Sequence, residues 1–153
     1  MNQVYLGIGS NKNHPYFRIN TVLKQINRIK STNIVKKSSL YVTKPLGPQA
    51  QPNFINCVIE IRTNLEPLAL LYELQNLERV HNRKKTKRWG PRSMDIDILI
   101  YNNLIMNTDK LIIPHPGLEY RDFVLIPLYE ITTYGYKIPK YGKIISLIRN
   151  LPW

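Results

Sequence analysis

Two carboxylates lie two positions apart in a short apolar run of this chain. Asp95 and Asp97 alternate with Met94, Ile96 and Ile98, and this alternation predicts a β-strand on which residues i and i+2 share a face. Two negative charges about 7 Å apart on a poorly solvated strand repel each other. Because Mg²⁺ favours one or two carboxylates completed by water and phosphate oxygens, the pair predicts a magnesium site.

The same alternation predicts which other side chains accompany the aspartates. Leu99 and Tyr101 are expected on the face of the two carboxylates, and Ile100 is expected on the opposite face with the other apolar residues. Both faces of this strand are then largely apolar, which is typical of a strand inside a sheet.

A basic segment directly precedes the strand. Residues 82–88 contain two arginines and three lysines, and Arg92 follows the Gly90-Pro91 turn. The segment has no apolar periodicity, so it predicts an exposed loop. Arginine and lysine complement phosphate oxygens. A solvated loop or a nucleic-acid patch would explain the charges equally well, but the nearby aspartates favour a polyphosphate.

The whole chain is strongly basic. Its 153 residues carry a formal net charge of +12 and the sequence pI is about 9.9. Such a charge attracts nucleic acids, membrane surfaces and nucleoside triphosphates alike, so it does not choose among these partners.

Length and cysteine content predict one domain over residues 1–153, because a chain of this size buries a core without disulfides or structural metal. The single cysteine, Cys57, lies in an apolar run and predicts a buried structural thiol in a reducing compartment. We find no secretory leader and no bilayer-length segment, so we expect a cytoplasmic protein without a membrane partner.

Hydrophobic periodicity predicts an alternation of strands and helices. The predicted strands are 4–8, 33–42, 54–63 and 94–101, and the predicted helices are 15–30, 65–81, 123–131 and 143–151. Asn102-Asn103 predicts a tight hairpin turn that leads to a short strand near 104–106. The order strand, helix, strand, strand, helix, strand is typical of an α+β fold, a ferredoxin-like α-β-α sandwich with a mainly antiparallel sheet.

A proline-rich loop, residues 43–56, joins the second and third predicted strands. Prolines stiffen a loop and hold its backbone groups at set positions. Such groups, the ring of Phe54 and the amide of Asn56 could bind a flat heteroaromatic ligand. An ordinary rigid surface loop is the alternative interpretation.

Four ordered motifs, taken together, are more specific than any one of them. They are Gly7-Ile8-Gly9-Ser10-Asn11, Pro-Leu-Gly-Pro-Gln-x-Gln-Pro at 45–52, Arg-Trp-Gly-Pro-Arg-x-x-Asp-x-Asp at 88–97, and Ile113-Pro114-His115-Pro116 followed by Arg121. Over nearly the whole chain they resemble the 6-hydroxymethyl-7,8-dihydropterin pyrophosphokinases. The resemblance implies an enzyme of folate biosynthesis that moves the terminal pyrophosphoryl group of ATP to the pterin hydroxymethyl oxygen and leaves AMP.

The resemblance also implies roles for individual residues. Asp95 and Asp97 would bind two Mg²⁺ ions, and the catalytic group would comprise these two aspartates with Arg83, Lys85 and Arg92. The implied ATP-binding residues are Gln75, Glu78, Trp89, Arg92, Ile98, Lys110, Leu111, Ile112, His115 and Arg121. The implied pterin-binding residues are Thr43, Pro45, Leu46, Phe54, Asn56, Trp89 and Phe123.

The resemblance implies two small-molecule partners, ATP and 6-hydroxymethyl-7,8-dihydropterin. It implies no nucleic-acid partner, and the chain is expected to be a monomer. The chain departs from the family pattern at Lys85, where arginine is frequent, and at Pro116, which replaces an aromatic residue of some members. Lysine lacks the bidentate fork of arginine.

Two other classes could also use these features. A ferredoxin-like RNA-binding module would explain the positive charge, but such modules display aromatic side chains on their strands, where this chain has aspartates. A metal-dependent nucleotidyl or glycosyl transferase could use Asp-x-Asp and would release pyrophosphate or a nucleoside diphosphate instead of AMP.

Overall fold

A computed structural model describes residues 1–44, 51–82 and 93–152. Its centre is a five-stranded sheet in the order β2-β4-β1-β5, with the short β3 paired to the same strand, β4, as β2. Every neighbouring pair is antiparallel. The strands are β1 (Asn2–Ser10), β2 (Thr32–Lys37), β3 (Tyr41–Thr43), β4 (Phe54–Thr63) and β5 (Asp95–Tyr101).

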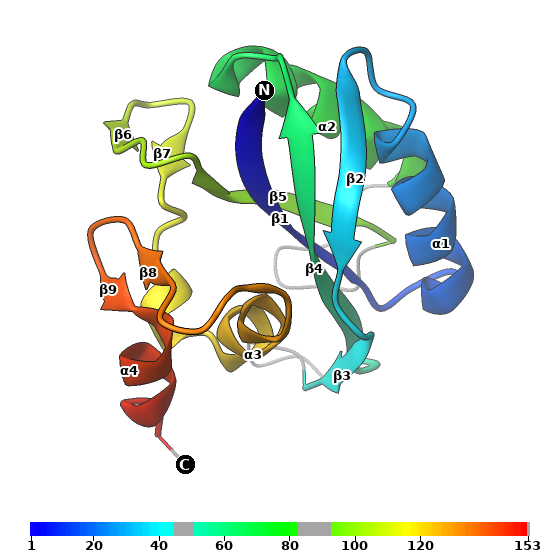
Figure 1. Cartoon of the computed structure of the whole chain (residues 1–153). Helices are drawn as coiled ribbons and strands as arrows, with labels where there is room; N and C mark the ends of the chain where they lie inside the picture. The colour runs from blue at the N-terminus through cyan, green and yellow to red at the C-terminus, as the bar shows by residue number, and fades with distance from the viewer. Residues whose placement is uncertain (45–50, 83–92, 153) are drawn as a thin grey trace.

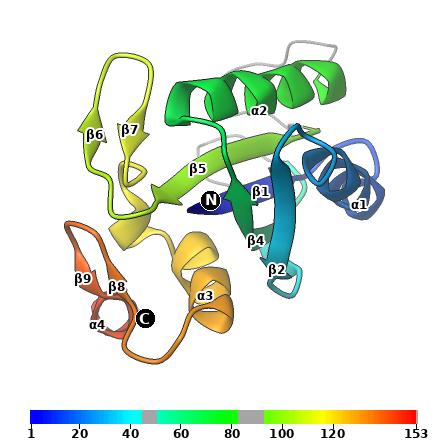
Figure 2. The same ribbon diagram turned by 45° about the horizontal axis from the view of Figure 1, so that its top comes forward.

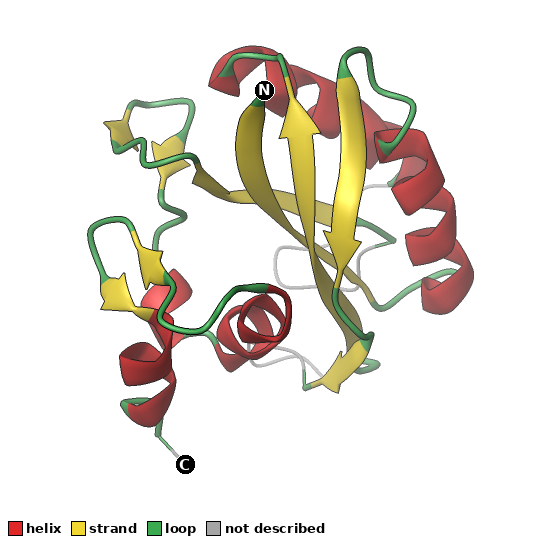
Figure 3. Ribbon diagram, viewed as in Figure 1, coloured by secondary structure: helices red, strands yellow, loops and turns green. Residues whose placement is uncertain are grey.

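Helices cover both faces of this sheet. Helices α1 (Pro15–Ile26) and α2 (Pro67–His81) lie on one face, and α3 (Asp122–Ile131) and α4 (Ile144–Arg149) lie on the other (Figures 1 and 2). Helix α1 connects β1 to β2, and β4 lies between these two strands in the sheet. Helix α2 connects β4 to β5, and β1 lies between those two strands (Figure 3). This split β-α-β arrangement confirms the predicted α+β, ferredoxin-like class.

Shorter elements complete the described chain. Two small hairpins and a turn of 3₁₀ helix lie beside the sheet (Figure 1). The hairpin within 106–113 packs against the core on the side of α1 and α2, and the hairpin within 137–143 packs against the core on the side of α3 and α4. These elements are β6 (Met106–Asn107), β7 (Ile112–Ile113), η1 (Leu118–Tyr120), β8 (Lys137–Ile138) and β9 (Gly142–Lys143). Among the described residues, none of the helices combines the length and apolar character needed to cross a lipid bilayer.

The core between the sheet and α1 and α2 follows the predicted alternation of β4. Ile55, Cys57, Ile59 and Ile61 are buried on this face, with the apolar stripes of the two helices packed against them. Cys57 is a buried free thiol, and burial raises its pKa to about 12. The predicted burial of this thiol is confirmed, and the raised pKa disfavours the reactive thiolate form.

A second core lies between the sheet and α3 and α4. Tyr5, Val58 and Leu99 from the sheet pack there with Leu125 and Leu128 of α3. Strand β4 therefore contributes side chains to both cores, one to each face in alternation.

A bulge in β5 changes the predicted facing of its last residues. Tyr5 pairs with Ile100, but the next residue, Leu6, pairs with Ile98, so Leu99 is an extra residue in the ladder. Leu99 and Ile100 consequently both belong to the core beside α3, whereas Tyr101 belongs to the core beside α1 and α2. The predicted faces of Tyr101 and Ile100 were wrong, because one inserted residue reverses the alternation that follows it.

The predicted strand 33–42 is two strands, β2 and β3. At Ser38, between them, the backbone N–H donates to the carbonyl of Val58 at 2.9 Å, and the hydroxyl accepts from the Val58 N–H at 2.9 Å. The side chain thus occupies a place in the ladder that a continuous strand would fill with a backbone carbonyl. Periodicity does not reveal such a substitution.

Other predicted bounds also shift. The first helix ends at Ile26 instead of residue 30, and the second begins at Pro67, a residue that suits a first helical turn. The final helix covers Ile144–Arg149 within the predicted 143–151. The strand expected near 104–106 is β6, which pairs with β7 rather than with the strand before the Asn102-Asn103 turn.

Candidate active site

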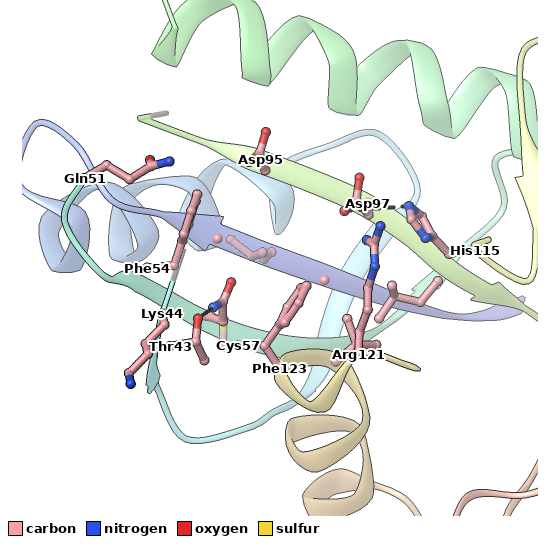
Figure 4. A pocket seen from close by; sticks show the side chains of 16 residues that line it. Thr43, Lys44, Gln51, Phe54, Cys57, Asp95, Asp97, His115, Arg121 and Phe123 are labelled. Atoms are coloured by element: carbon pink, nitrogen blue, oxygen red, sulfur yellow. Dashed lines mark hydrogen bonds and ion pairs between the residues drawn. The ribbon is translucent and has the colours of Figure 1, made fainter. Parts of the chain in front are cut away.

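A cavity of about 430 Å³ opens on the α3 side of the sheet, at the end where β1, β4 and β5 meet the start of α3 (Figure 4). Its lining includes residues from four strands, β1, β3, β4 and β5, from α3 and from the segment before α3. These segments are distant in the sequence, and the strand order β4-β1-β5 brings them together.

The floor of the cavity lacks side chains along β1. Gly7 and Gly9 alternate there and both line the cavity. A Cβ atom on Gly9 would lie 2.6 Å from Oδ1 of Asn56, so a larger residue would displace that amide. The second glycine of the Gly-Ile-Gly motif, Gly9, thus has a steric reason to lack a side chain.

Two aromatic rings point into the cavity. Phe54 comes from the first residue of β4 and Phe123 from the first turn of α3, and neither is fully buried (Figure 4). The guanidinium carbon of Arg121 lies 5.7 Å from the centroid of the Phe123 ring, within range of a cation–π interaction. The rings of Phe54 and Phe123 can therefore stack on a flat ligand in the cavity.

A buried amide lies beside these rings. Asn56 is 8% exposed, and its Nδ2 donates to the hydroxyl oxygen of Thr43. Its Oδ1 is the atom next to Gly9. A buried amide with one fixed partner has a defined orientation, which suits it to distinguish donors from acceptors on a ligand.

Both aspartates of the Asp-x-Asp motif line the cavity. The side chain of Asp97 is 47% exposed, and its Oδ2 lies 3.8 Å from Nε2 of His115. The other imidazole nitrogen, Nδ1, lies 2.9 Å from the carbonyl oxygen of Pro116, which can only accept, so Nδ1 carries a proton. Nε2 of His115 therefore faces the carboxylate.

The carboxylates of Asp95 and Asp97 suit Mg²⁺ better than they suit a metal ion whose ligands all come from the protein. Within residues 1–44, 51–82 and 93–152 no group of three or more His, Cys, Asp and Glu side chains could hold a metal ion. Two carboxylates on one strand leave coordination positions for water and for phosphate oxygens, which is the arrangement that Mg²⁺ favours.

Several predicted ATP-binding residues lie away from this cavity. Ile98 is buried in the core beside α1 and α2, on the face opposite the aspartates. Glu78 of α2 accepts a hydrogen bond at 3.0 Å from the backbone N–H of Ile96. Gln75 is exposed on α2. Lys110, Leu111 and Ile112 lie at and beside the β6–β7 hairpin. None of these described residues lines the cavity.

The end of α2 is fixed to the start of β5 by Asn82. Its side chain donates to the carbonyl of Met94 at 2.6 Å and accepts from the N–H of Met94 at 3.1 Å. The segment with the predicted catalytic arginines begins after Asn82. The predictions for Pro45, Leu46, Arg83, Lys85, Trp89 and Arg92 fall outside the described residues.

Some residues that line the cavity were missed from the sequence. Lys44, Gln51, Leu99 and Val124 line it without having been predicted as site residues. Gln51 could have been found, because it belongs to the proline-rich motif, and its Oε1 accepts from Nδ2 of Asn11 at 2.7 Å. Lys44 belongs to the proline-rich loop and Leu99 was expected on the face of the two aspartates, so the sequence held a signal for both. Val124 had none, since only the packing of α3 on the sheet brings it to the cavity.

The chain is similar to known proteins over almost its full length. A sequence profile of the 7,8-dihydro-6-hydroxymethylpterin-pyrophosphokinase (HPPK) family matches residues 5–133. The chain is 44% identical over 146 residues to the 2-amino-4-hydroxy-6-hydroxymethyldihydropteridine pyrophosphokinase of Haemophilus influenzae, covering 95% of this chain and 91% of that one. Identity to the Pseudomonas aeruginosa protein of the same name is 40% over 151 residues, covering 99% and 93% of the two chains.

A solved structure has the same fold. A crystal structure of an HPPK-DHPS protein in complex with substrates superposes with a TM-score of 0.76 at 17% identity. The match covers 97% of this chain and 44% of that longer chain.

The order of the motifs, the cavity lined by described residues from each of them, and the 40–44% identity over nearly the whole chain point to one family. The chain belongs to the 7,8-dihydro-6-hydroxymethylpterin-pyrophosphokinase family, the pyrophosphokinases of folate biosynthesis.

Proposed function

We propose that this chain, as one catalytic domain, transfers the β,γ-pyrophosphoryl group of ATP to the hydroxymethyl oxygen of 6-hydroxymethyl-7,8-dihydropterin. One observation carries the proposal: a single cavity holds two aromatic rings, a buried amide and the Asp-x-Asp pair. The cytoplasmic location and the monomeric state expected from the sequence stay predictions.

The acceptor half of the cavity suits a pterin. A flat bicyclic ring would stack between Phe54 and Phe123, and its polar edge would meet the amide of Asn56. Thr43, which accepts from that amide, would keep it oriented. The hydroxymethyl group would then extend toward β5, where the carboxylates lie.

The donor half suits a polyphosphate. Asp95 and Asp97 would hold two Mg²⁺ ions, which when bound supply positive charge next to the phosphate oxygens. Arg121 lies on the same side of the cavity as Phe123 and could contact a phosphate. His115 faces Asp97 and would restrict where that carboxylate points.

The reaction needs alignment more than covalent participation by the protein. The acceptor oxygen would attack the β-phosphorus in line, the bond from that phosphorus to the α–β bridging oxygen would break, and AMP would leave. The hydroxyl proton would pass to solvent. Arg83 and Lys85 on the basic segment, and Arg92 after the Gly90-Pro91 turn, are the predicted basic catalytic residues, and Arg92 is the one predicted to contact the ATP phosphates.

Analysis of the reaction products tests the proposal. Purified protein is mixed with ATP, Mg²⁺ and the pterin, and mass spectrometry should find AMP and a diphosphorylated pterin. ADP with a monophosphorylated pterin would contradict pyrophosphoryl transfer, and free pyrophosphate would indicate a nucleotidyl transferase instead.

The metal assignment has its own test. Asp97→Ala is expected to reduce kcat at saturating Mg²⁺ by about 10³-fold or more, because a carboxylate that holds the ion is lost. The fold should remain, since the side chain of Asp97 is partly exposed. The matched control is Asp109→Ala, an exposed carboxylate outside the cavity. Near-normal turnover of Asp97→Ala would contradict the assignment.

A further inference from the structure

A carboxylate outside the cavity, Glu130, makes an unusual number of hydrogen bonds for an exposed residue. The backbone N–H of Ser39 donates to both of its oxygens at 3.0 Å. The Ser39 hydroxyl donates to Oε2 at 2.8 Å, and the Tyr41 hydroxyl donates to Oε1 at 2.6 Å. Glu130, Ser39 and Tyr41 are called the Glu130 clamp below.

The local sequence alone does not favour a carboxylate at this position. Glu130 lies in the last turn of α3, where the negative end of the helix dipole disfavours a negative charge. The Tyr41 hydrogen bond nevertheless holds the pKa of Glu130 below its usual range, and the same bond raises the pKa of Tyr41 to about 12. A side chain that opposes the local preference and is satisfied by distant residues indicates a tertiary role.

The clamp connects the two walls of the cavity. Tyr41 begins β3, and Thr43 ends it, on the same face two residues later. In the sheet, Tyr41 lies opposite Asn56 and Thr43 lies opposite Phe54. Glu130 lies on α3, the helix whose first turn carries Phe123. The hydrogen bonds of Glu130 thus join β3, which carries Thr43, to α3, which carries Phe123.

We propose that Glu130 is a positioning residue for the pterin: it holds α3 against β3 and thereby sets the separation of Phe123 from Thr43 and Asn56. This inference rests on the proposed acceptor cavity. Loss of the clamp lets α3 and β3 move relative to each other, so ring and amide no longer meet the ligand together.

The clamp can be tested by substitutions that keep the size of the side chain but weaken or remove its hydrogen bonds. Glu130→Gln removes the charge, and Tyr41→Phe removes only the hydroxyl. Each is expected to raise KM for the pterin by about fivefold, because hydrogen bonds to a charged group are the stronger ones but exposure weakens them. The kcat and the KM for ATP should stay within about twofold. Glu73→Gln removes one negative charge from α2 outside the cavity and is the matched control.

A double variant separates the clamp from general destabilisation. If the two residues act through one bond, Tyr41→Phe with Glu130→Gln should raise KM no more than the larger single effect. Multiplying effects, unchanged KM for the pterin in both single variants, or an equal rise in both KM values would each overturn the inference. Calorimetric titration with the pterin checks the same change in affinity without turnover.

Asn56→Ala, measured in parallel, distinguishes failure of the clamp from failure of the cavity assignment. If Asn56→Ala raises KM for the pterin while the clamp variants do not, the cavity assignment stands and the clamp is wrong. If Asn56→Ala also has no effect, the acceptor cavity is misplaced and the inference falls with it.

Discussion

At the scale of the residue, Gly9 shows how the absence of a side chain shapes the site. It lies opposite Asn56 across the β1–β4 ladder, and the space that its Cβ would take holds the amide oxygen of Asn56. The neighbouring glycine is less constrained, because a Cβ on Gly7 would meet Leu99 at 3.4 Å, which a small shift relieves.

Gly9→Ala is therefore expected to damage pterin binding more than Gly7→Ala does. The added methyl group forces Asn56 away, so we expect KM for the pterin to rise by about tenfold, the loss of one well-placed hydrogen bond. Gly7→Ala should raise it less. Steady-state kinetics with varied pterin measure both, and equal effects of the two variants would contradict the steric argument.

At the scale of the element, a histidine joins the two helices on one face of the sheet. His81, at the end of α2, is buried. Its Nδ1 lies 3.2 Å from Nη1 of Arg18 and its Nε2 lies 2.7 Å from Oε1 of Gln25, both on α1. Arginine can only donate, so Nδ1 accepts and Nε2–H donates, and the imidazole is neutral.

This neutral histidine predicts a pH dependence of stability. Burial, and then the charge of Arg18, lower the pKa of His81 below 6.5. The unfolded chain then binds a proton more readily than the folded one, so the free energy of unfolding falls as pH drops below about 6.5. Urea titrations at pH 7.5 and pH 5.5 measure this slope.

His81→Gln should flatten that slope, because glutamine does not titrate. The control is His14→Asn, an exposed histidine at a φ of 63° that asparagine adopts readily. An unchanged slope in His81→Gln would show that another group governs the pH dependence.

At the scale of the whole molecule, one sheet supports two separate cores. The core beside α1 and α2 contains Leu74, and the core beside α3 and α4 contains Leu125, both fully buried. Because strands β1, β4 and β5 contribute to both cores, neither layer of helices can detach without exposing the sheet.

Leu74→Ala and Leu125→Ala are each expected to lower the free energy of unfolding by about 2–5 kcal/mol, from lost burial and the cavity left behind. Each variant should still unfold in one cooperative transition, since the cores share strands. Denaturation followed by circular dichroism and by fluorescence tests this. Non-coincident curves would show that the two layers unfold separately.

Local patterns in the sequence determined the order of strands and helices, the shared face of Asp95 and Asp97 and the buried position of Cys57, because the periods of 2 and 3.6 residues are properties of neighbouring residues. The ordered motifs also determined the family. Only the tertiary structure decided the bulge at Leu99, the interruption of the strand at Ser38, the contact of Gly9 with Asn56 and the Glu130 clamp. Each depends on register between segments distant in the chain, which no local period encodes.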